Sequence, residues 1–207
     1  MKLNDWNDHE VERAEKTWGH KVHPYSEEMF NFAIEGMNSW LDLGCGFGRF
    51  LEYLLTKVDE PDYTGYDSSQ DMIDRSGERF PVYRSRTFLH NITAPINCSP
   101  DSIICSAILI HITMKDQLAA LKRIKEKNPK KLSFDINSPS EKFLKGCQNH
   151  YERIITGKGW SSKFRMTWQS HYEMTKTVNK LFPNYNVKTG FYELAQERQK
   201  VIYMLQR

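Results

Sequence analysis

The sequence lacks the features that mark several protein classes. Its four cysteines include no C-x-x-C pair, and none of them stands with histidine at the spacing of a zinc site. Its longest apolar run, residues 103–112, is far shorter than the roughly 20 residues that a membrane-spanning helix needs. We therefore expect no metal site and no membrane association.

The sequence also has little excess of one charge sign, because 29 lysines and arginines are nearly balanced by 26 acidic residues. The net charge is +3. Proteins that bind nucleic acid through charge carry a larger, clustered excess. The densest basic cluster lies where a helix is expected to end, and cations there complement the helix dipole. We interpret it as a solvated helix terminus, with an RNA-facing patch as the alternative. Its members are Lys122, Arg123, Lys125, Lys127, Lys130 and Lys131.

The length of 207 residues predicts one domain that can bury a sizeable core, although only 39% of the residues are apolar. Residues 1–8 lack the apolar stretch of a secretory signal, and a chain of this size needs no disulfides. Together these features predict reduced thiols and a cytoplasmic protein. The sequence gives no indication of the oligomeric state.

Two helices are expected first, at 7–18 and 26–34, before the first strand. Short apolar runs and amphipathic stretches then alternate as far as residue 137. This alternation predicts right-handed βαβ crossovers and a mostly parallel sheet. The expected strands are 40–43, 63–66, 81–89, 102–109 and 132–136, and the expected helices are 47–58, a short one after Ser68 and Ser69, and 113–127.

After Ser138 the pattern changes. Residues 140–155 and 172–182 have helical character, whereas 185–194 and 200–206 are two closely spaced strands that predict an antiparallel hairpin. The predicted organisation is an N-terminal helical cap over 1–36, a cofactor-binding core over 37–137, and a substrate-shaping insert with the final hairpin over 138–207.

The most informative segment runs from Asp42 to Arg49, where Gly44, Gly46 and Gly48 lie between a buried strand and a helix. Glycine accepts positive φ and lets the backbone approach a ligand closely, and a helix start favours a negative group. Nineteen residues after Gly48, at the end of the next strand, Asp67 can accept hydrogen bonds from both hydroxyls of a ribose. Because three glycines cost entropy, a plain turn without a ligand is the weaker interpretation.

At this point the sequence resembles the class I S-adenosylmethionine-dependent methyltransferases, through residues 42–50, 65–67 and 106–112. The resemblance covers roughly residues 40–137, and the final hairpin also suits the family. It implies a Rossmann-like, doubly wound sheet with helices on both faces. It also implies S-adenosylmethionine as cofactor, S-adenosylhomocysteine as product, and cofactor contacts from Asp42, Gly44, Cys45, Gly46, Gly48, Arg49, Asp67, Ser68, Met72, Asn91, Ile92, Ser106 and Ala107.

Three of these positions have alternative interpretations. Arg49 stands at a helix start, where a cation is disfavoured, so its partner is either the carboxylate of the cofactor or a neighbour such as Glu52 or Asp59. Cys45 is a small space-filling residue rather than a nucleophile, because no base is fixed beside it. Asn91 stands where the family often has an acid, although its amide oxygen can still accept.

His111 is the candidate general base, because it follows the fourth strand at the carboxyl edge of the sheet. A structural role is the alternative. Tyr25, Trp160 and Tyr172 are, with His111, the candidate substrate residues. The Pro-Pro-aromatic motif of amino-methylating DNA enzymes is absent after the fourth strand, and so is a Pro-Cys nucleophile.

We therefore predict methyl transfer to an oxygen or nitrogen of a small-molecule acceptor. An RNA or protein acceptor remains open. An NAD(P)-dependent oxidoreductase is a further alternative, against which the glycine spacing argues because Arg49 stands where the third glycine of G-x-G-x-x-G belongs. The last alternative function is that of a non-catalytic cofactor-binding protein on the same fold.

Overall fold

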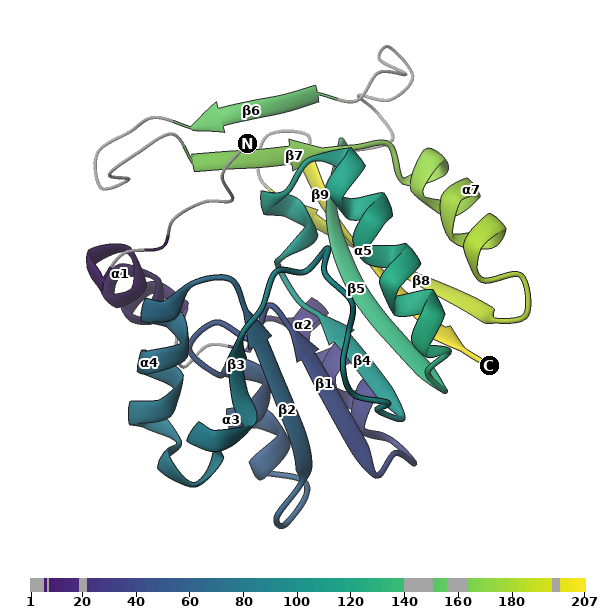
Figure 1. The fold of residues 1–207 in the computed structure, drawn as a ribbon. Helices are drawn as coiled ribbons and strands as arrows, with labels where there is room; N and C mark the ends of the chain where they lie inside the picture. The colour runs from purple at the N-terminus through teal and green to yellow at the C-terminus, as the bar shows by residue number, and fades with distance from the viewer. Residues whose placement is uncertain (1–5, 7, 19–21, 140–150, 156–163, 195–197) are drawn as a thin grey trace.

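A computed structural model describes residues 6, 8–18, 22–139, 151–155, 164–194 and 198–207 of the chain (Figure 1). Nine strands form one sheet, with the order β3-β2-β1-β4-β5-β7-β6, and β9 pairs with both β5 and β8. The strands are β1 (Ser39–Leu43), β2 (Asp62–Asp67), β3 (Thr87–Leu89), β4 (Ser102–Cys105), β5 (Lys131–Pro139), β6 (Tyr151–Ile155), β7 (Phe164–Trp168), β8 (Asn186–Leu194) and β9 (Arg198–Gln206).

Strands β1 to β5 run parallel, whereas β9 is antiparallel to β5 and to β8. The prediction of a mostly parallel, doubly wound α/β sheet with a C-terminal antiparallel hairpin is therefore confirmed. The helices are α1 (Asp8–Trp18), α2 (Pro24–Ile34), α3 (Arg49–Leu55), α4 (Gln70–Arg79), α5 (Met114–Lys127) and α7 (His171–Leu181), with short 3₁₀ helices η1 (Pro81–Arg86) and η2 (Leu109–His111).

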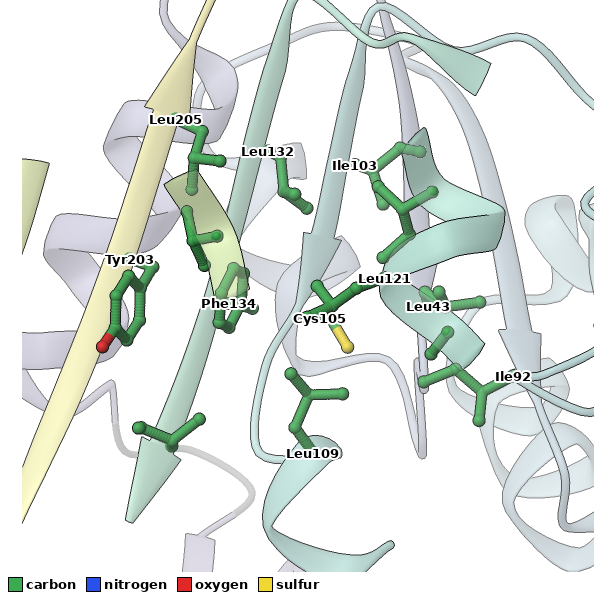
Figure 2. Close-up of a cluster of buried hydrophobic side chains, with 14 of the residues drawn as sticks. Leu43, Ile92, Ile103, Cys105, Leu109, Leu121, Leu132, Phe134, Tyr203 and Leu205 are labelled. Carbon is green, nitrogen blue, oxygen red and sulfur yellow. The ribbon is translucent and has the colours of Figure 1, made fainter. Parts of the chain in front are cut away.

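The two faces of the sheet bury different side chains, because successive residues of a strand point to opposite faces. On β5, Leu132, Phe134 and Ile136 belong to the apolar cluster under α5 and α7. Figure 2 shows Phe134 beside Tyr203 of β9 in that cluster. The alternate residue Asp135 consequently points to the opposite face, which α2 and α3 cover.

Several element boundaries differ from the prediction. Residues 81–86 form η1 and only 87–89 are a strand, since Pro81 fixes the backbone angle that a 3₁₀ turn accepts. The fourth strand ends at Cys105, and η2 follows. Helix α3 starts at Arg49 rather than at residue 47, because Gly48 before it has a left-handed φ of 89°.

The predicted helix over 140–155 is wrong for residues 151–155, which form β6, and its other residues lie outside the described part. Helix α2 begins at Pro24, after His23, rather than at residue 26. On α5, Leu121 and Ile124 are buried, whereas Leu118 is 39% exposed. The division into one domain with three parts stays a prediction.

Candidate functional site

The turn between β1 and α3 is held open by glycine. Gly44, Gly46 and Gly48 have φ values of 89°, 53° and 89°. A Cβ atom on Gly44 would lie 2.8 Å from the side chain of Ile108, and one on Gly48 would lie 2.7 Å from the Phe80 ring. Both the backbone angle and the space therefore require glycine at these two positions.

Asp67 at the end of β2 holds this turn in place. One of its carboxylate oxygens accepts from the Gly46 amide at 2.9 Å, and the other accepts from the Ser69 amide at 2.9 Å. Burial raises the pKa of Asp67, and these backbone hydrogen bonds oppose that rise. The carboxylate thus orders the glycine turn and the start of α4 together.

Asp42 is a second buried carboxylate in the same region. The Tyr63 hydroxyl donates to it at 3.3 Å. Burial raises the pKa of Asp42 to about 7, the hydrogen bond from Tyr63 opposes the rise, and the negative charge of Asp67 adds to it. Burial makes the ionised form of this carboxyl group unfavourable. A cationic group in the adjoining cavity, such as an ammonium, would stabilise that ionised form.

Arg49 is the cation of the site, and burial lowers its pKa. The groups whose charge favours its ionised form are Tyr25, Asp135 and Asp42, followed by Glu52. Glu52 also accepts from Arg79 at 2.8 Å. The neighbours of Arg49 thus include Asp135 and Asp42, which the sequence did not suggest as its partners.

The opposite wall follows β4. Ala107 has a φ of 58°, which is uncommon for a residue with a side chain, and its amide donates to Asp135 at 2.5 Å. His111 ends η2, and its ring meets the Trp6 ring edge-on with 5.9 Å between centroids. The segment from Ser106 to His111 therefore faces the glycine turn.

These walls enclose a hollow of about 690 Å³, part of which is open to solvent. Ten of the predicted site residues line it, namely Asp42, Gly44, Cys45, Gly46, Arg49, Asp67, Met72, Ser106, Ala107 and His111. Sequence reasoning missed six further lining residues, which are Trp6, Ala14, Phe30, Phe47, Phe50 and Ile108.

The remaining predicted site residues lie elsewhere among the described residues. Gly48 packs against Phe80 behind the turn, and Ser68 is not part of the lining. The Asn91 amide oxygen accepts from the amide and hydroxyl of Thr93, so it is already engaged. Ile92 is buried in the core under α5.

The candidate substrate residues are spread out. Tyr25 lies behind Arg49, where Lys200 is 5.5 Å from its ring, and it is not among the lining residues. Tyr172 is 55% exposed on α7 and stacks beside His171. Trp160 lies outside the described residues. Of the three candidates that lie in the described part of the chain, only His111 lines the hollow.

Helix α1 covers the hollow from the N-terminal side. Val11 and Ala14 pack against Phe47 and Met72, and the Ser69 hydroxyl donates to the Trp6 carbonyl at 2.9 Å. Glu15 accepts from Arg75 of α4 at 2.6 Å. The sequence signal for this cover was the apolar stripe of the first helix.

The described residues include no cluster of histidine, cysteine and acidic side chains that could hold a metal ion. None of the helices among them is long and apolar enough to cross a membrane. Cys45, Cys98 and Cys105 carry free thiols, and burial raises the pKa of Cys45 and Cys105, which keeps both as neutral thiols. The buried, neutral Cys45 fits a space-filling residue better than a nucleophile.

Comparison with known proteins gives a consistent result. Residues 41–127 match the family model described as a methyltransferase domain. A Mycobacterium tuberculosis protein, provisionally named a methyltransferase, is 36% identical over 67 residues. That alignment covers 32% of this chain and 39% of the relative, so the chain matches about two fifths of the length of this curated relative.

Solved structures resemble almost the whole chain. An S-adenosylmethionine-dependent methyltransferase from Clostridium acetobutylicum has a TM-score of 0.63 at 16% identity, covering 95% of this chain and 96% of that one. Magnesium protoporphyrin IX methyltransferase from Synechocystis, solved with S-adenosylhomocysteine, has a TM-score of 0.65 at 14% identity, covering 98% and 95%.

The structure of a methyltransferase that acts on small RNA also resembles the chain, with a TM-score of 0.56 at 17% identity, covering 87% of this chain and 25% of that one. At such identities these likenesses establish the fold alone.

Proposed function

We propose that this chain, whose residues 41–127 match the family model of a methyltransferase domain, binds S-adenosylmethionine and transfers its methyl group to a small-molecule acceptor. The observation that carries the proposal is the meeting of Asp42, the glycine turn, Asp67 and residues 106–111 around one hollow. Each stretch was proposed from the sequence as part of the site, and together they come from the ends of three strands, β1, β2 and β4.

The residues fit this cofactor chemically. Asp42 has a raised pKa and faces the hollow, so an ammonium group there would stabilise its ionised form. Gly44 lines the hollow with its backbone, because Ile108 leaves no room for a side chain there. Asp67 lines the hollow and can accept from ribose hydroxyls in addition to the amides that it already binds.

When bound, S-adenosylmethionine supplies an electrophilic methyl carbon on a positively charged sulfur. The chain contributes by holding an acceptor atom in line with that carbon, which can remove much of the barrier. Ser106 and Ala107 form the wall beside it. His111, at the rim, takes the acceptor's proton where the acceptor has one to lose.

The small-molecule acceptor is favoured over RNA by the state of the basic cluster. Lys131 is buried and donates to the carbonyls of Phe32 and Glu35, where it caps the end of α2. Lys130 pairs with Asp101, and Arg123 pairs with Glu126. Half of the cluster is thus committed to the chain's own groups rather than displayed as a continuous basic surface.

Calorimetry with S-adenosylhomocysteine tests the cofactor. The wild type should bind, and Asp67→Ala should weaken binding about 100-fold because a charged acceptor of two hydroxyls is lost. Asp62→Ala is the matched control, since it removes an exposed carboxylate, paired with Arg86, from the other end of β2. Absence of binding by the wild type, or preferential binding of NADH, would overturn the proposal.

A panel assay with methyl-labelled S-adenosylmethionine tests the acceptor. Small phenols, carboxylic acids and amines are compared with total RNA and with denatured protein. Label should move to a member of the small-molecule set. Transfer to RNA or protein alone would show that the acceptor is a macromolecule and not a small molecule. Cofactor binding without transfer to any member would favour the non-catalytic alternative.

A further inference from the structure

The wall that carries Ser106 and His111 contains a strained residue. Ala107 has a φ of 58°, where a side chain is unfavourable, and such a residue persists only when its surroundings impose the conformation. The next residue, Ile108, packs onto Gly44, where a Cβ atom would lie 2.8 Å away. One side of the wall is therefore fixed by the glycine turn.

The other side is fixed by Asp135. This side chain is completely buried on β5, and one of its oxygens accepts from the Ala107 amide at 2.5 Å. A hydrogen bond to a charged acceptor is shorter and stronger than a neutral one. Asp135 therefore supplies the force that keeps Ala107 in its left-handed conformation.

The charge of Asp135 is itself compensated from the last strand. Lys200 of β9 donates to the second oxygen of Asp135 at 2.7 Å, and its side chain is 6% exposed. The register pairs Asn137 with Lys200, so Lys200 lies diagonal to Asp135 on the same face of the sheet. Tyr25 of α2 covers the ammonium group, with 5.5 Å to its ring centre.

A buried ion pair is a poor stabiliser, because the loss of hydration offsets the attraction between the charges. Apolar residues of similar size would serve the core as well. The position of the pair indicates its role, since Asp135 binds the strained amide that leads into η2 and His111.

We infer that Asp135, neutralised by Lys200, is a positioning residue that sets the place of Ser106 and His111 at the methyl-transfer site. Asp135 is not among the residues that line the hollow, and it acts through the Ala107 amide. The consequence of this inference rests on the proposed function. The hydrogen bond from the Ala107 amide to Asp135, which we call the clamp on Ala107, can be measured without any turnover.

The first measurement is made on the unliganded protein by NMR. In the wild type the Ala107 amide proton should resonate far downfield and exchange slowly. In Asp135→Asn the downfield shift should vanish and exchange should accelerate about tenfold or more, the equivalent of one charge-assisted hydrogen bond. Glu28→Gln is the matched control, because it changes a carboxylate that binds Tyr192 and Lys188, away from Ala107.

A second substitution separates the clamp from general destabilisation. Gly at position 107 adopts positive φ without strain, so Asp135→Asn should matter less in the Ala107→Gly background. If Asp135→Asn does not fold, Asp135→Asn with Lys200→Met replaces it, since removing both partners of a buried pair is tolerated better than removing one.

The consequence for the site is measured by adding S-adenosylhomocysteine. Binding should perturb the His111 ring signals in the wild type and much less in Asp135→Asn, while the dissociation constant changes by less than about threefold because the glycine turn is intact. With an acceptor from the panel, kcat should fall about 100-fold with little change in KM.

An Ala107 amide that behaves alike in wild type and Asp135→Asn would overturn the clamp. Equal effects of Asp135→Asn with and without Ala107→Gly would do the same. A clamp that is confirmed in a protein that does not bind S-adenosylhomocysteine would instead refute the proposed function alone.

Discussion

The two walls of the hollow are built from contacts of different range. On the β1–β2 wall, the Gly46 amide donates to Asp67, 21 residues away, Asp67 also accepts from the nearby Ser69 amide, and backbone amides make most of the hydrogen bonds. On the β4–β5 wall, Ala107 depends on Asp135, 28 residues away, which depends on Lys200, a further 65 residues away. The first wall lies wholly within residues 42–69, whereas the second wall has a motif at 106–112 but also depends on Asp135 and Lys200, which lie outside any motif.

The largest expected effect comes from breaking the long-range wall. Lys200→Met removes the cation that is hydrogen-bonded to buried Asp135, leaves Arg49 as a charged neighbour, and should lower the free energy of unfolding by about 3–5 kcal/mol. Lys188→Met on the neighbouring strand removes an ion pair whose lysine side chain is 71% exposed, and should lower it by less than about 1 kcal/mol. Urea unfolding followed by circular dichroism measures both, and equal losses would contradict the burial argument.

The next effect comes from the local wall. Gly44→Ala combines a left-handed backbone angle with a close contact to Ile108 and should cost about 3 kcal/mol of stability. Gly36→Ala, at a φ of 70° with open space around it, should cost only about 1 kcal/mol. The same unfolding experiment compares them, and a Gly36→Ala loss as large as that of Gly44→Ala would show that contact with Ile108 adds nothing.

A smaller effect is the pH dependence that Asp42 gives to the local wall. Its pKa of about 7 lies above its ordinary value, so its proton favours the folded protein at low pH, and this contribution is lost as pH rises through about 7. Binding of a cation requires the ionised form. Affinity for S-adenosylhomocysteine should therefore fall about tenfold for each pH unit below 7.

Calorimetry across pH 5 to 8 measures this dependence. In Asp42→Asn the slope should disappear, and affinity should be uniformly low. A slope that persists in this variant would assign the titration to another group.

The smallest effect compares two helix caps. Ser69 accepts from the Met72 amide at the start of α4, and Thr113 accepts from the Asp116 amide at the start of α5. Each substitution to alanine should cost about 1 kcal/mol of stability. Only Ser69→Ala should also weaken S-adenosylhomocysteine binding, because Ser69 holds the Trp6 carbonyl over the hollow. Equal binding by both variants would show that this contact does not shape the site.

The contrast between the walls explains what the sequence could predict. Residues 42–67 show their role through glycine spacing and a carboxylate at the end of the next strand, and the structure brings them together as expected. Asn91 and Ile92 were expected at the cofactor site, but the Asn91 oxygen accepts from Thr93 and Ile92 packs in the core, since a residue after a strand can serve the core or its own turn as well as a ligand. Asp135 was overlooked, although a lone acid inside the apolar run 132–136 was its signal.

What the sequence could not supply was pairing between distant segments. The role of Lys200 as the partner of Asp135 can be recognised only from the register that pairs β9 with β5. Trp6 and Ala14 reach the hollow only because α1 packs on α4. Both depend on tertiary packing, which local patterns do not encode.

The ion pair between β5 and β9 also orders the events of synthesis. All residues of the glycine turn and its carboxylates have left the ribosome once β2 has, whereas the wall opposite waits for residue 200 to emerge and pair. Until then Asp135 keeps water around its charge, and Ala107 lacks its restraint. The wall at Ala107 is therefore completed last, when β9 pairs with β5.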